Sequence, residues 1–123
     1  MPKTSKRILI AEDDKAASKV LVMELQKSGF EAVLTENGAE ALKALAEGRY
    51  DLLLLDIVMP NTDGFSVLER LKKDGSSVPV IVLSNLGDSN DEKRAMGLGA
   101  KAFLVKADTP IKNIIAKIES ILK

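Results

Sequence analysis

The sequence of 123 residues contains no cysteine and no histidine. Without cysteine the chain forms no disulfide and offers neither a thiolate nucleophile nor a zinc–sulfur site. Without histidine it has no Ser-His-Asp triad, no imidazole metal ligand and no phosphohistidine of its own. Any metal ion that the chain binds must therefore have oxygen ligands, which favours Mg²⁺, Mn²⁺ or Ca²⁺.

The sequence also lacks an excess of charge of either sign, because 18 basic residues balance 18 acidic ones. A net charge near zero gives no electrostatic sign of nucleic-acid or membrane binding, so we expect neither. No apolar run is long enough to span a bilayer, and residues 1–7 lack the apolar core of a signal peptide. We expect a cytoplasmic protein with one domain over residues 1–123 and a core at about 7–122.

Two short apolar runs end in acidic residues. Residues 8–11 lead into Glu12-Asp13-Asp14, and residues 52–55 lead into Asp56. A buried strand that ends in a carboxylate costs free energy unless a nearby group compensates the charge. If the two strands are neighbours, several carboxylates converge at one edge, where a hard cation such as Mg²⁺ would neutralise them.

Strand and helix patterns alternate along the chain. Apolar runs predict strands at 8–11, 32–35, 52–55, 78–83 and 102–105. Amphipathic or capped segments predict helices at 15–28, between Asn37 and Gly48, up to Gly75, at 88–98 and from Pro110 onward. This alternation indicates an α/β fold, in which helices cover both faces of a parallel five-stranded sheet.

Two of the predicted helices have distinctive sequences. The segment 88–98 is mostly polar and ends near Gly97 and Gly99, so we expect its local stability to be low. In the last helix we expect Pro110 at the first position, after a cap from Asp108 or Thr109.

Polar groups follow four of the predicted strands at the edge where open α/β sheets bind ligands. Acids follow the first and third strands, Ser84 follows the fourth and Lys106 follows the fifth. This ordered set resembles the receiver domain of two-component response regulators, and the chain is similar to the stand-alone, chemotaxis-type members. The resemblance covers essentially the whole chain and rests on Glu12-Asp13, Asp56, Met59-Pro60, Asp63-Gly64, Ser84 and Lys106.

The resemblance implies a doubly wound, flavodoxin-like (βα)5 three-layer sandwich with strand order 2-1-3-4-5. It also implies that Asp56 is a phosphoacceptor that forms an aspartyl phosphate, with Lys106 and the Ser84 hydroxyl contacting phosphoryl oxygens. The ligands implied for Mg²⁺, with Mn²⁺ as the alternative, are Asp13, Asp56, the backbone carbonyl of Val58 and, through water, Glu12. Asp14 is expected to cap the first helix instead.

The resemblance further implies a signalling module of a His-Asp phosphorelay and not an enzyme, beyond its own phosphoryl transfer and autodephosphorylation. The implied partners are a sensor histidine kinase or a His-phosphotransfer protein, and an unidentified downstream protein. Ser84 and Phe103 would form the switch that remodels the face of the fourth helix, the last strand and the last helix. The chain would be a monomer or a phosphorylation-dependent dimer.

Two residues depart from the family pattern next to the implied site. Ala107 follows Lys106 where the family usually has proline, often after a cis peptide. Because a cis bond before alanine costs about 3–4 kcal/mol, we expect a trans bond. Asn85 follows Ser84 where the family usually has a small residue. These departures motivate an alternative, a pseudo-receiver that takes no phosphoryl group and acts only as a protein-interaction module, although the complete set of acids argues against it.

Two other functions fit the residues less well. A phosphatase of the haloacid dehalogenase type needs a second aspartate two residues after the nucleophile, where this chain has Val58. A flavin-binding flavodoxin needs a phosphate loop rich in serine, threonine and glycine after the first strand. Here Glu12-Asp13-Asp14 would repel phosphate in the absence of a metal ion.

Overall fold

Continuous apolar runs and amphipathic segments produce the predicted alternation of strands and helices. The computed structural model describes residues 6–58, 63–85 and 89–122. Its strands are β1 (Arg7–Ala11), β2 (Glu31–Thr35), β3 (Leu52–Asp56), β4 (Val80–Ser84) and β5 (Ala102–Val105). Its helices are α1 (Lys15–Lys27), α2 (Gly38–Glu47), α3 (Gly64–Lys73), α4 (Ser89–Gly97) and α5 (Ile111–Ile121), with a short 3-10 turn, η1 (Lys106–Asp108), after β5.

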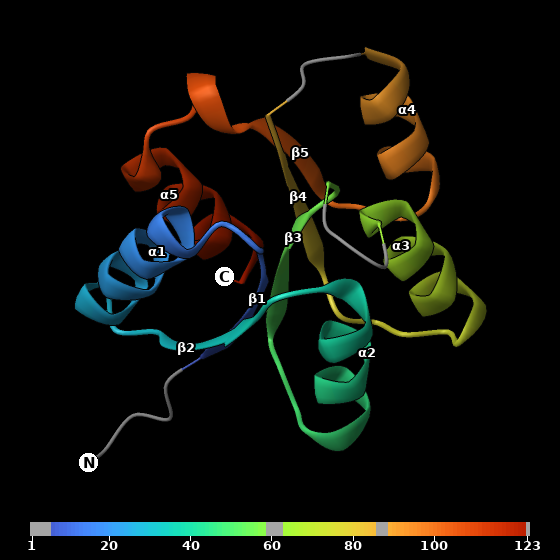
Figure 1. Cartoon of the computed structure of the whole chain (residues 1–123), viewed down its shortest axis with the longest axis horizontal. Coiled ribbons are helices and arrows are strands. Elements are labelled where there is room, and N and C mark those ends of the chain that lie inside the picture. Colours follow the sequence, from blue (N-terminus) through green and yellow to red (C-terminus); the bar gives the residue numbers. More distant parts are fainter. Residues whose placement is uncertain (1–5, 59–62, 86–88, 123) are drawn as a thin grey trace.

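The five strands form one parallel sheet in the order β2-β1-β3-β4-β5, which confirms the predicted fold and strand order. Helices α1 and α5 lie on one face of the sheet, and α2, α3 and α4 lie on the other (Figure 1). The strand order reverses between β1 and β3, so the loops after these strands leave the sheet side by side.

The strand register brings the predicted polar groups to one level of the sheet. It pairs Ala11 with Leu55, Asp56 with Leu83 and Ser84 with Val105. The residues that follow these strand ends therefore share the carboxyl edge of the sheet.

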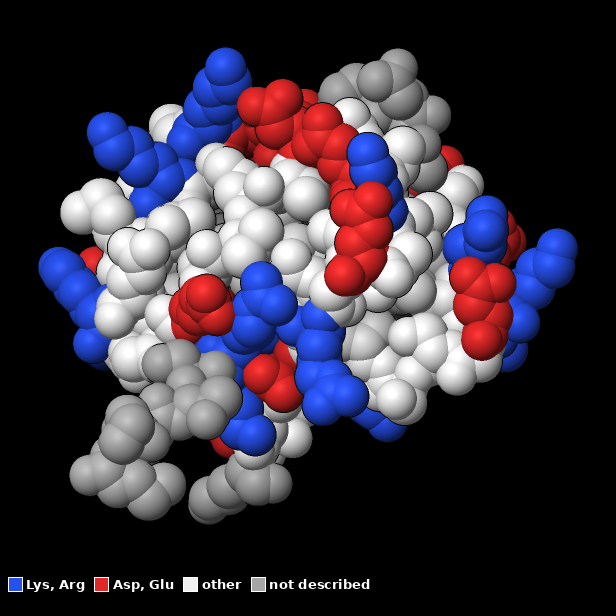
Figure 2. Space-filling model, turned by 90° about the horizontal axis from the view of Figure 1, so that it is seen from below, with Lys and Arg blue, Asp and Glu red and all other residues white. Residues whose placement is uncertain are grey.

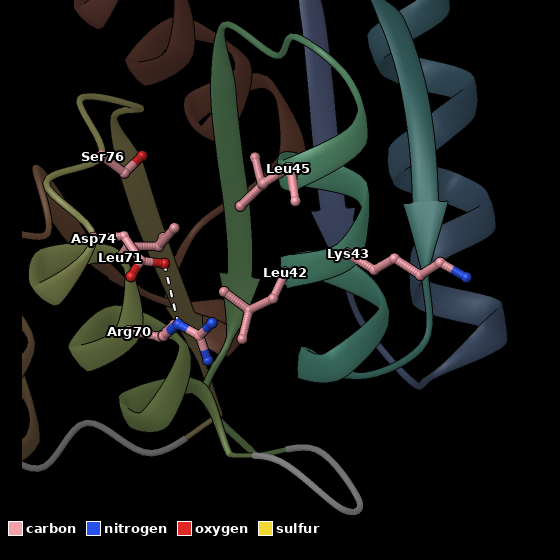
Figure 3. A pocket seen from close by; sticks show the side chains of 8 residues that line it. Leu42, Lys43, Leu45, Arg70, Leu71, Asp74 and Ser76 are labelled. Atoms are coloured by element: carbon pink, nitrogen blue, oxygen red, sulfur yellow. Dashed lines mark hydrogen bonds and ion pairs between the residues drawn. The ribbon is translucent and has the colours of Figure 1, made fainter.

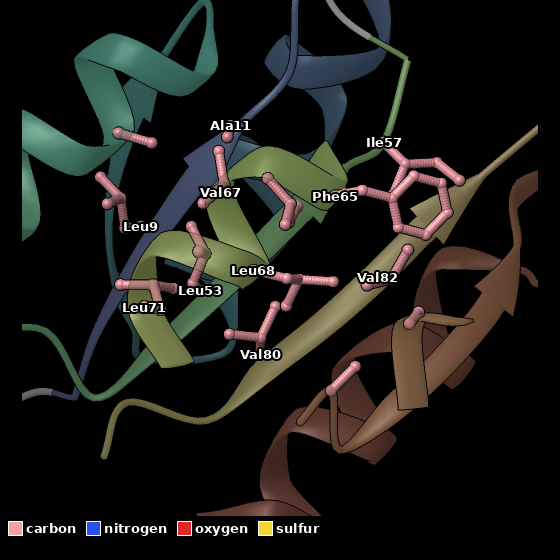
Figure 4. Close-up of a cluster of buried hydrophobic side chains, with 14 residues drawn as sticks. Leu9, Ala11, Leu53, Ile57, Phe65, Val67, Leu68, Leu71, Val80 and Val82 are labelled. Atoms are coloured by element: carbon pink, nitrogen blue, oxygen red, sulfur yellow. The ribbon is translucent and has the colours of Figure 1, made fainter. Parts of the chain in front are cut away.

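The side chains of the central strand alternate between two hydrophobic cores. Leu53 and Leu55 face the α2–α4 side, where a cluster that also contains Phe65 and Val82 fills the space under α3 (Figure 4). Leu52 and Leu54 face α1 and α5 and pack with buried side chains of both helices. All five residues of β3 are buried, as the uninterrupted apolar run predicts for a strand covered on both faces.

The observed N-terminal caps are the predicted ones in two helices and differ from the prediction in a third. Asp14 caps α1 and Asn37 caps α2, each accepting backbone N–H bonds through its side chain. The predicted cap of the last helix is wrong: α5 begins at Ile111 after Pro110, without a side-chain cap. The Thr109 hydroxyl donates instead to the Val105 carbonyl at 2.8 Å, and Asp108 lies in η1.

Some expectations fall outside the described residues, namely the Met59-Pro60 turn and the predicted start of the fourth helix at residue 88.

Within the described ranges, no helix is long and apolar enough to cross a membrane. Basic and acidic side chains are interspersed over the face shown in Figure 2, in keeping with the balanced charge of the sequence.

Candidate functional site

Three carboxylates meet at the carboxyl edge of the sheet. Glu12 and Asp13 directly follow β1, and Asp56 ends β3; one oxygen from each side chain lies within 4.8 Å of the others. Asp13 is exposed, whereas Glu12 and Asp56 are only 2% and 4% exposed. Burying two carboxylates this close together is unfavourable unless a cation accompanies them.

The Lys106 side chain provides a positive charge for this acidic pocket. Lys106 begins η1 directly after β5, and its ammonium donates to Glu12 and, at 3.2 Å, to Asp56 Oδ2. The predicted convergence of the first, third and fifth strand ends on one site is therefore present in the structure.

Burial and these contacts shift two pKa values in the pocket. Burial raises the pKa of the Glu12 carboxyl above its ordinary value, and the neighbouring Asp56 adds to the rise against the opposing hydrogen bond from Lys106. Burial alone would lower the pKa of Lys106, but the hydrogen bond to Glu12 and the charges of both acids outweigh it, so this pKa lies above its ordinary value. Lys106 is therefore a cation throughout the physiological pH range.

Local backbone contacts fix the direction of the Asp56 carboxylate. Its Oδ1 accepts the Val58 N–H at 3.0 Å, and its Oδ2 accepts the Lys106 ammonium. Val58, whose carbonyl is a predicted metal ligand, is 59% exposed two residues after Asp56. The Gly64 N–H donates to the Ile57 carbonyl at 3.0 Å, so the first turn of α3 lies directly against this segment.

Ser84 and Phe103, the two residues of the predicted switch, occupy different levels of the sheet. Ser84 is completely buried at the end of β4, one residue beyond the partner of Asp56 in the strand register. Phe103 pairs in register with Val82 and packs, partly buried, against the core under α3 and α4. Ser84 therefore lies at the edge that carries the acids, whereas Phe103, on the outer strand β5, lies level with a residue two positions before Ser84.

The residues beside the site behave as their local chemistry predicts. Asp14 Oδ1 accepts the backbone N–H groups of Ala16 and Ala17, so Asp14 is a cap and not a member of the carboxylate cluster. The described chain contains no cis peptide bond, which confirms the trans bond expected before Ala107. With alanine at this position, Lys106 still reaches both buried acids.

The donor set fits a small divalent cation. The cluster brings three carboxyl groups together, and two of them share a single ammonium, that of Lys106. All the candidate ligands are oxygen atoms, which Mg²⁺ prefers, and an exposed carboxylate such as Asp13 leaves room for the waters that Mg²⁺ retains.

Other hollows in the described surface lie outside this carboxylate cluster. A cavity of about 420 Å³ lies between α2 and α3, with Leu42, Leu45 and Leu71 as its apolar lining and the Arg70–Asp74 ion pair beside it (Figure 3). A second cavity, of about 280 Å³, lies between α1 and α5 and borders the pocket through Glu12 and Lys106.

Two side chains of α3, Phe65 and Lys72, contact α4, and the sequence did not predict either contact. The Arg94 guanidinium lies over the ring of Phe65, and Lys72 donates to the carbonyl of Gly97. A basic residue in a polar helix gives no indication of its partner, because such charges are usually solvated.

Comparisons with known proteins agree with this geometry. Residues 8–119 match the family described as the response regulator receiver domain. The chain is 37% identical over 116 residues to the "Uncharacterized transcriptional regulatory protein YkoG" of Bacillus subtilis, covering 94% of this chain and 50% of that protein. It is also 37% identical over 120 residues to the transcriptional regulatory protein PrrA of Mycobacterium tuberculosis, covering 98% of this chain and 51% of that protein.

The chain thus spans about half the length of the curated relatives that it matches. Among solved structures, the receiver domain of the Francisella response regulator 1452 superposes with a TM-score of 0.91 at 27% identity, covering 96% of this chain and 97% of that one.

Proposed function

The chain belongs to the response regulator receiver domain family, and we propose that it takes up a phosphoryl group on Asp56 as the acceptor of a His-Asp phosphorelay. Receiver domains are signalling modules of two-component systems, and they interact with histidine kinases or phosphotransfer proteins. The observation that carries the proposal is the pairing of one ammonium, Lys106, with the two buried carboxylates Glu12 and Asp56. An ammonium beside an oriented carboxylate stabilises the charge of an incoming phosphoryl group.

Receiver domains generally bind Mg²⁺ at an acidic pocket, and the carboxylate cluster of this chain fits such an ion. We propose that Asp13, Asp56 and the Val58 carbonyl hold Mg²⁺ or Mn²⁺, with Glu12 acting through water. When bound, the ion offsets the repulsion between carboxylates and phosphoryl oxygens.

In the proposed reaction, a carboxylate oxygen of Asp56 forms a bond to phosphorus while the N–P bond of a donor phosphohistidine breaks. The imidazole nitrogen keeps the electron pair of the broken bond and takes up a proton. The N–H of Val58 and the ammonium of Lys106 orient the Asp56 carboxylate. Because phosphoryl transfer depends chiefly on position and charge, a weakly basic carboxylate suffices as the nucleophile.

A donor phosphohistidine would lie outside these 123 residues, which contain no histidine. A sensor histidine kinase or a His-phosphotransfer protein supplies the phosphoryl group in this proposal. The single receiver domain then acts on a downstream protein through the face formed by α4, β5 and α5. Ser84 lies at the acidic edge of the sheet, and Phe103 lies in the core beside α4. In this proposal, a movement of Ser84 would be transmitted to the α4–β5–α5 face through Phe103.

Intact-mass spectrometry after treatment with acetyl phosphate tests the proposal. We expect the wild type to gain the mass of one phosphoryl group in the presence of Mg²⁺ and no mass in its absence. Asp56→Asn should gain none. The matched control is Asp51→Asn, which removes an acid next to the other end of β3 and should leave the gain intact.

The outcomes separate the candidate functions. A gain that persists in Asp56→Asn would place the acceptor elsewhere and refute the assignment. No gain in the wild type, with acetyl phosphate and with phosphorylated histidine kinases as donors, would favour the pseudo-receiver. The residue that motivates this second candidate is Asn85, which is exposed next to Ser84 where the family usually has a small residue.

A further inference from the structure

Helix α4 has few buried contacts with the rest of the domain. Ala95 is the one buried side chain among the described residues of this helix, and it packs in the core cluster that contains Phe65. The other residues of α4 are exposed, apart from the half-buried Asp91. Burial of a single methyl group stabilises a helix very little, because the hydrophobic stabilisation is proportional to the apolar area removed from water. The position of α4 therefore depends on the contacts that reach it from neighbouring elements.

Two such contacts come from α3. The Arg94 guanidinium carbon lies 4.1 Å from the centre of the Phe65 ring, well within the range of a cation–π interaction. In the same last turn of α4, the Lys72 ammonium donates to the Gly97 carbonyl at 3.3 Å. The first contact is the more informative one, because Phe65 shares a core cluster with Ile57, the residue after Asp56.

Phe65 belongs to the core that supports both strands ending at the site. Its ring is 8% exposed and shares a cluster with Ile57, which follows Asp56, and with Val82, which lies two residues before Ser84 (Figure 4). The preceding residue, Gly64, is so close to this segment that an added Cβ would lie 2.5 Å from the Ile57 Cα. Movement of residues 56–58 must therefore displace the first turn of α3 and its ring.

We propose that the Arg94–Phe65 contact couples the acidic pocket to α4, with Arg94 as a positioning residue that opposes remodelling of this helix. The inference rests on the proposed phosphorylation of Asp56. If that event moves α4, the helix must leave the ring of Phe65 and lose the cation–π contact. Because coupling between two sites is reciprocal, removing the contact must then strengthen binding of a phosphoryl group at the pocket.

The expected size of the effect follows from the exposure of Arg94. A cation–π contact at an exposed position contributes about as much free energy as a two- to five-fold change in an equilibrium constant. Arg94→Gln should therefore bind Mg²⁺–beryllofluoride, a mimic of the phosphoryl group, about two- to five-fold more tightly than the wild type. Amide hydrogen exchange at Ala95, Leu98 and Ala100 should accelerate by a similar factor in the ligand-free protein.

The experiment measures both quantities by NMR in the wild type, Arg94→Gln and Lys93→Gln. Lys93→Gln removes the same charge from an exposed neighbour on the same helix. Its affinity for Mg²⁺–beryllofluoride and its exchange rates should equal those of the wild type. Phe65→Leu keeps an apolar side chain but removes the ring, so Arg94→Gln should have no further effect in that background. This double-mutant comparison distinguishes the contact from a general effect of charge.

Each outcome decides the proposal. Tighter binding and faster exchange in Arg94→Gln, absent in Lys93→Gln, would support the coupling. Faster exchange with unchanged affinity for Mg²⁺–beryllofluoride would overturn it, because Arg94 would then only stabilise α4. If Arg94→Gln had the same beryllofluoride affinity and the same exchange rates as Lys93→Gln, the proposal would be overturned as well. If the wild type itself binds no beryllofluoride, the proposed phosphorylation fails and this inference falls with it. In the other negative outcomes the wild type binds beryllofluoride, and only the coupling fails.

Discussion

The Lys106 ammonium donates to Asp56 Oδ2 at 3.2 Å, although the two residues are fifty positions apart in the sequence. The contact joins the ends of β3 and β5, which lie two strands apart in the sheet with β4 between them. Lys106 also donates to Glu12, so a single cation serves two buried carboxylates. If Asp56 is phosphorylated as proposed, two roles compete for this ammonium: neutralising the buried carboxylates and attracting an incoming phosphoryl group.

This competition leads to opposite expectations for Lys106→Met. Without the ammonium, the carboxylates lose their neutralising partner, so we expect Mg²⁺ to bind about tenfold more tightly, a gain of roughly 1.4 kcal/mol. Phosphoryl uptake should slow by roughly a hundred-fold, as for other losses of a donor to a developing negative charge. Chemical-shift titration with Mg²⁺ and intact-mass kinetics with acetyl phosphate measure the two effects.

Lys101→Met is the matched control for this prediction. Lys101 is exposed and precedes β5, so the variant removes the same charge without removing a partner of the acids. We expect Mg²⁺ affinity and phosphorylation rate close to those of the wild type. Weaker Mg²⁺ binding in Lys106→Met would contradict the competition and would mean that Lys106 chiefly organises the ligands.

The sequence predicted which residues would meet at the site because a parallel sheet leaves few alternatives. Polar residues directly after buried strands must lie at the carboxyl edge, and Asp56, Glu12 and Lys106 do so. What the sequence could not provide was the partner of each charge. Whether Lys106 would reach the acids with Ala107 in place of proline depended on the conformation of η1, which local patterns do not determine.

The errors in predicting the fold have the same origin. The cap of α1 by Asp14 depends only on residues within one turn, and the sequence predicted it correctly. The cap of α5 did not follow the pattern: Pro110 stands at the cap position, and the Thr109 hydroxyl donates to the Val105 carbonyl at the end of β5. The contact between Arg94 and Phe65 joins two helices and has no signature in either segment.

Neutralising one member of the carboxylate cluster should separate metal binding from stability. In Asp13→Asn we expect the shift of Tm on adding Mg²⁺ to disappear, since the stabilisation by a ligand follows RT ln(1 + [L]/Kd). The metal-free variant should be as stable as the wild type or slightly more stable, because repulsion among the acids decreases. Thermal unfolding with excess Mg²⁺ and with EDTA measures both effects.

Asp14→Asn is the control for Asp13→Asn, because it removes the adjacent acid and retains a good capping side chain. Asp14 lies outside the carboxylate cluster and bonds to the backbone of Ala16 and Ala17. Its Mg²⁺-induced shift of Tm should therefore equal that of the wild type. Asp14→Ala should lower stability by about 1 kcal/mol through loss of the cap. Loss of the Mg²⁺ response in Asp14→Asn would assign this residue to the metal site.

The close approach of Gly64 to the segment at Asp56 and Ile57 leads to the last prediction. A Cβ at this position would lie 2.5 Å from the Ile57 Cα and 3.0 Å from the Asp56 carbonyl oxygen, so the backbone itself must move. We expect Gly64→Ala to lower the free energy of unfolding by about 1–3 kcal/mol, as other overpacked sites do, and to reduce Mg²⁺ affinity by displacing Asp56.

Gly97→Ala is the control, because no atom lies within 4 Å of the added methyl group at the end of α4. It should be neutral or slightly stabilising, since alanine favours the helix over glycine. Urea denaturation of both variants, with and without Mg²⁺, measures these differences. Equal stability of Gly64→Ala and the wild type would mean that α3 can shift away from the site at no cost, and the coupling of this helix to Asp56 would then have to be abandoned.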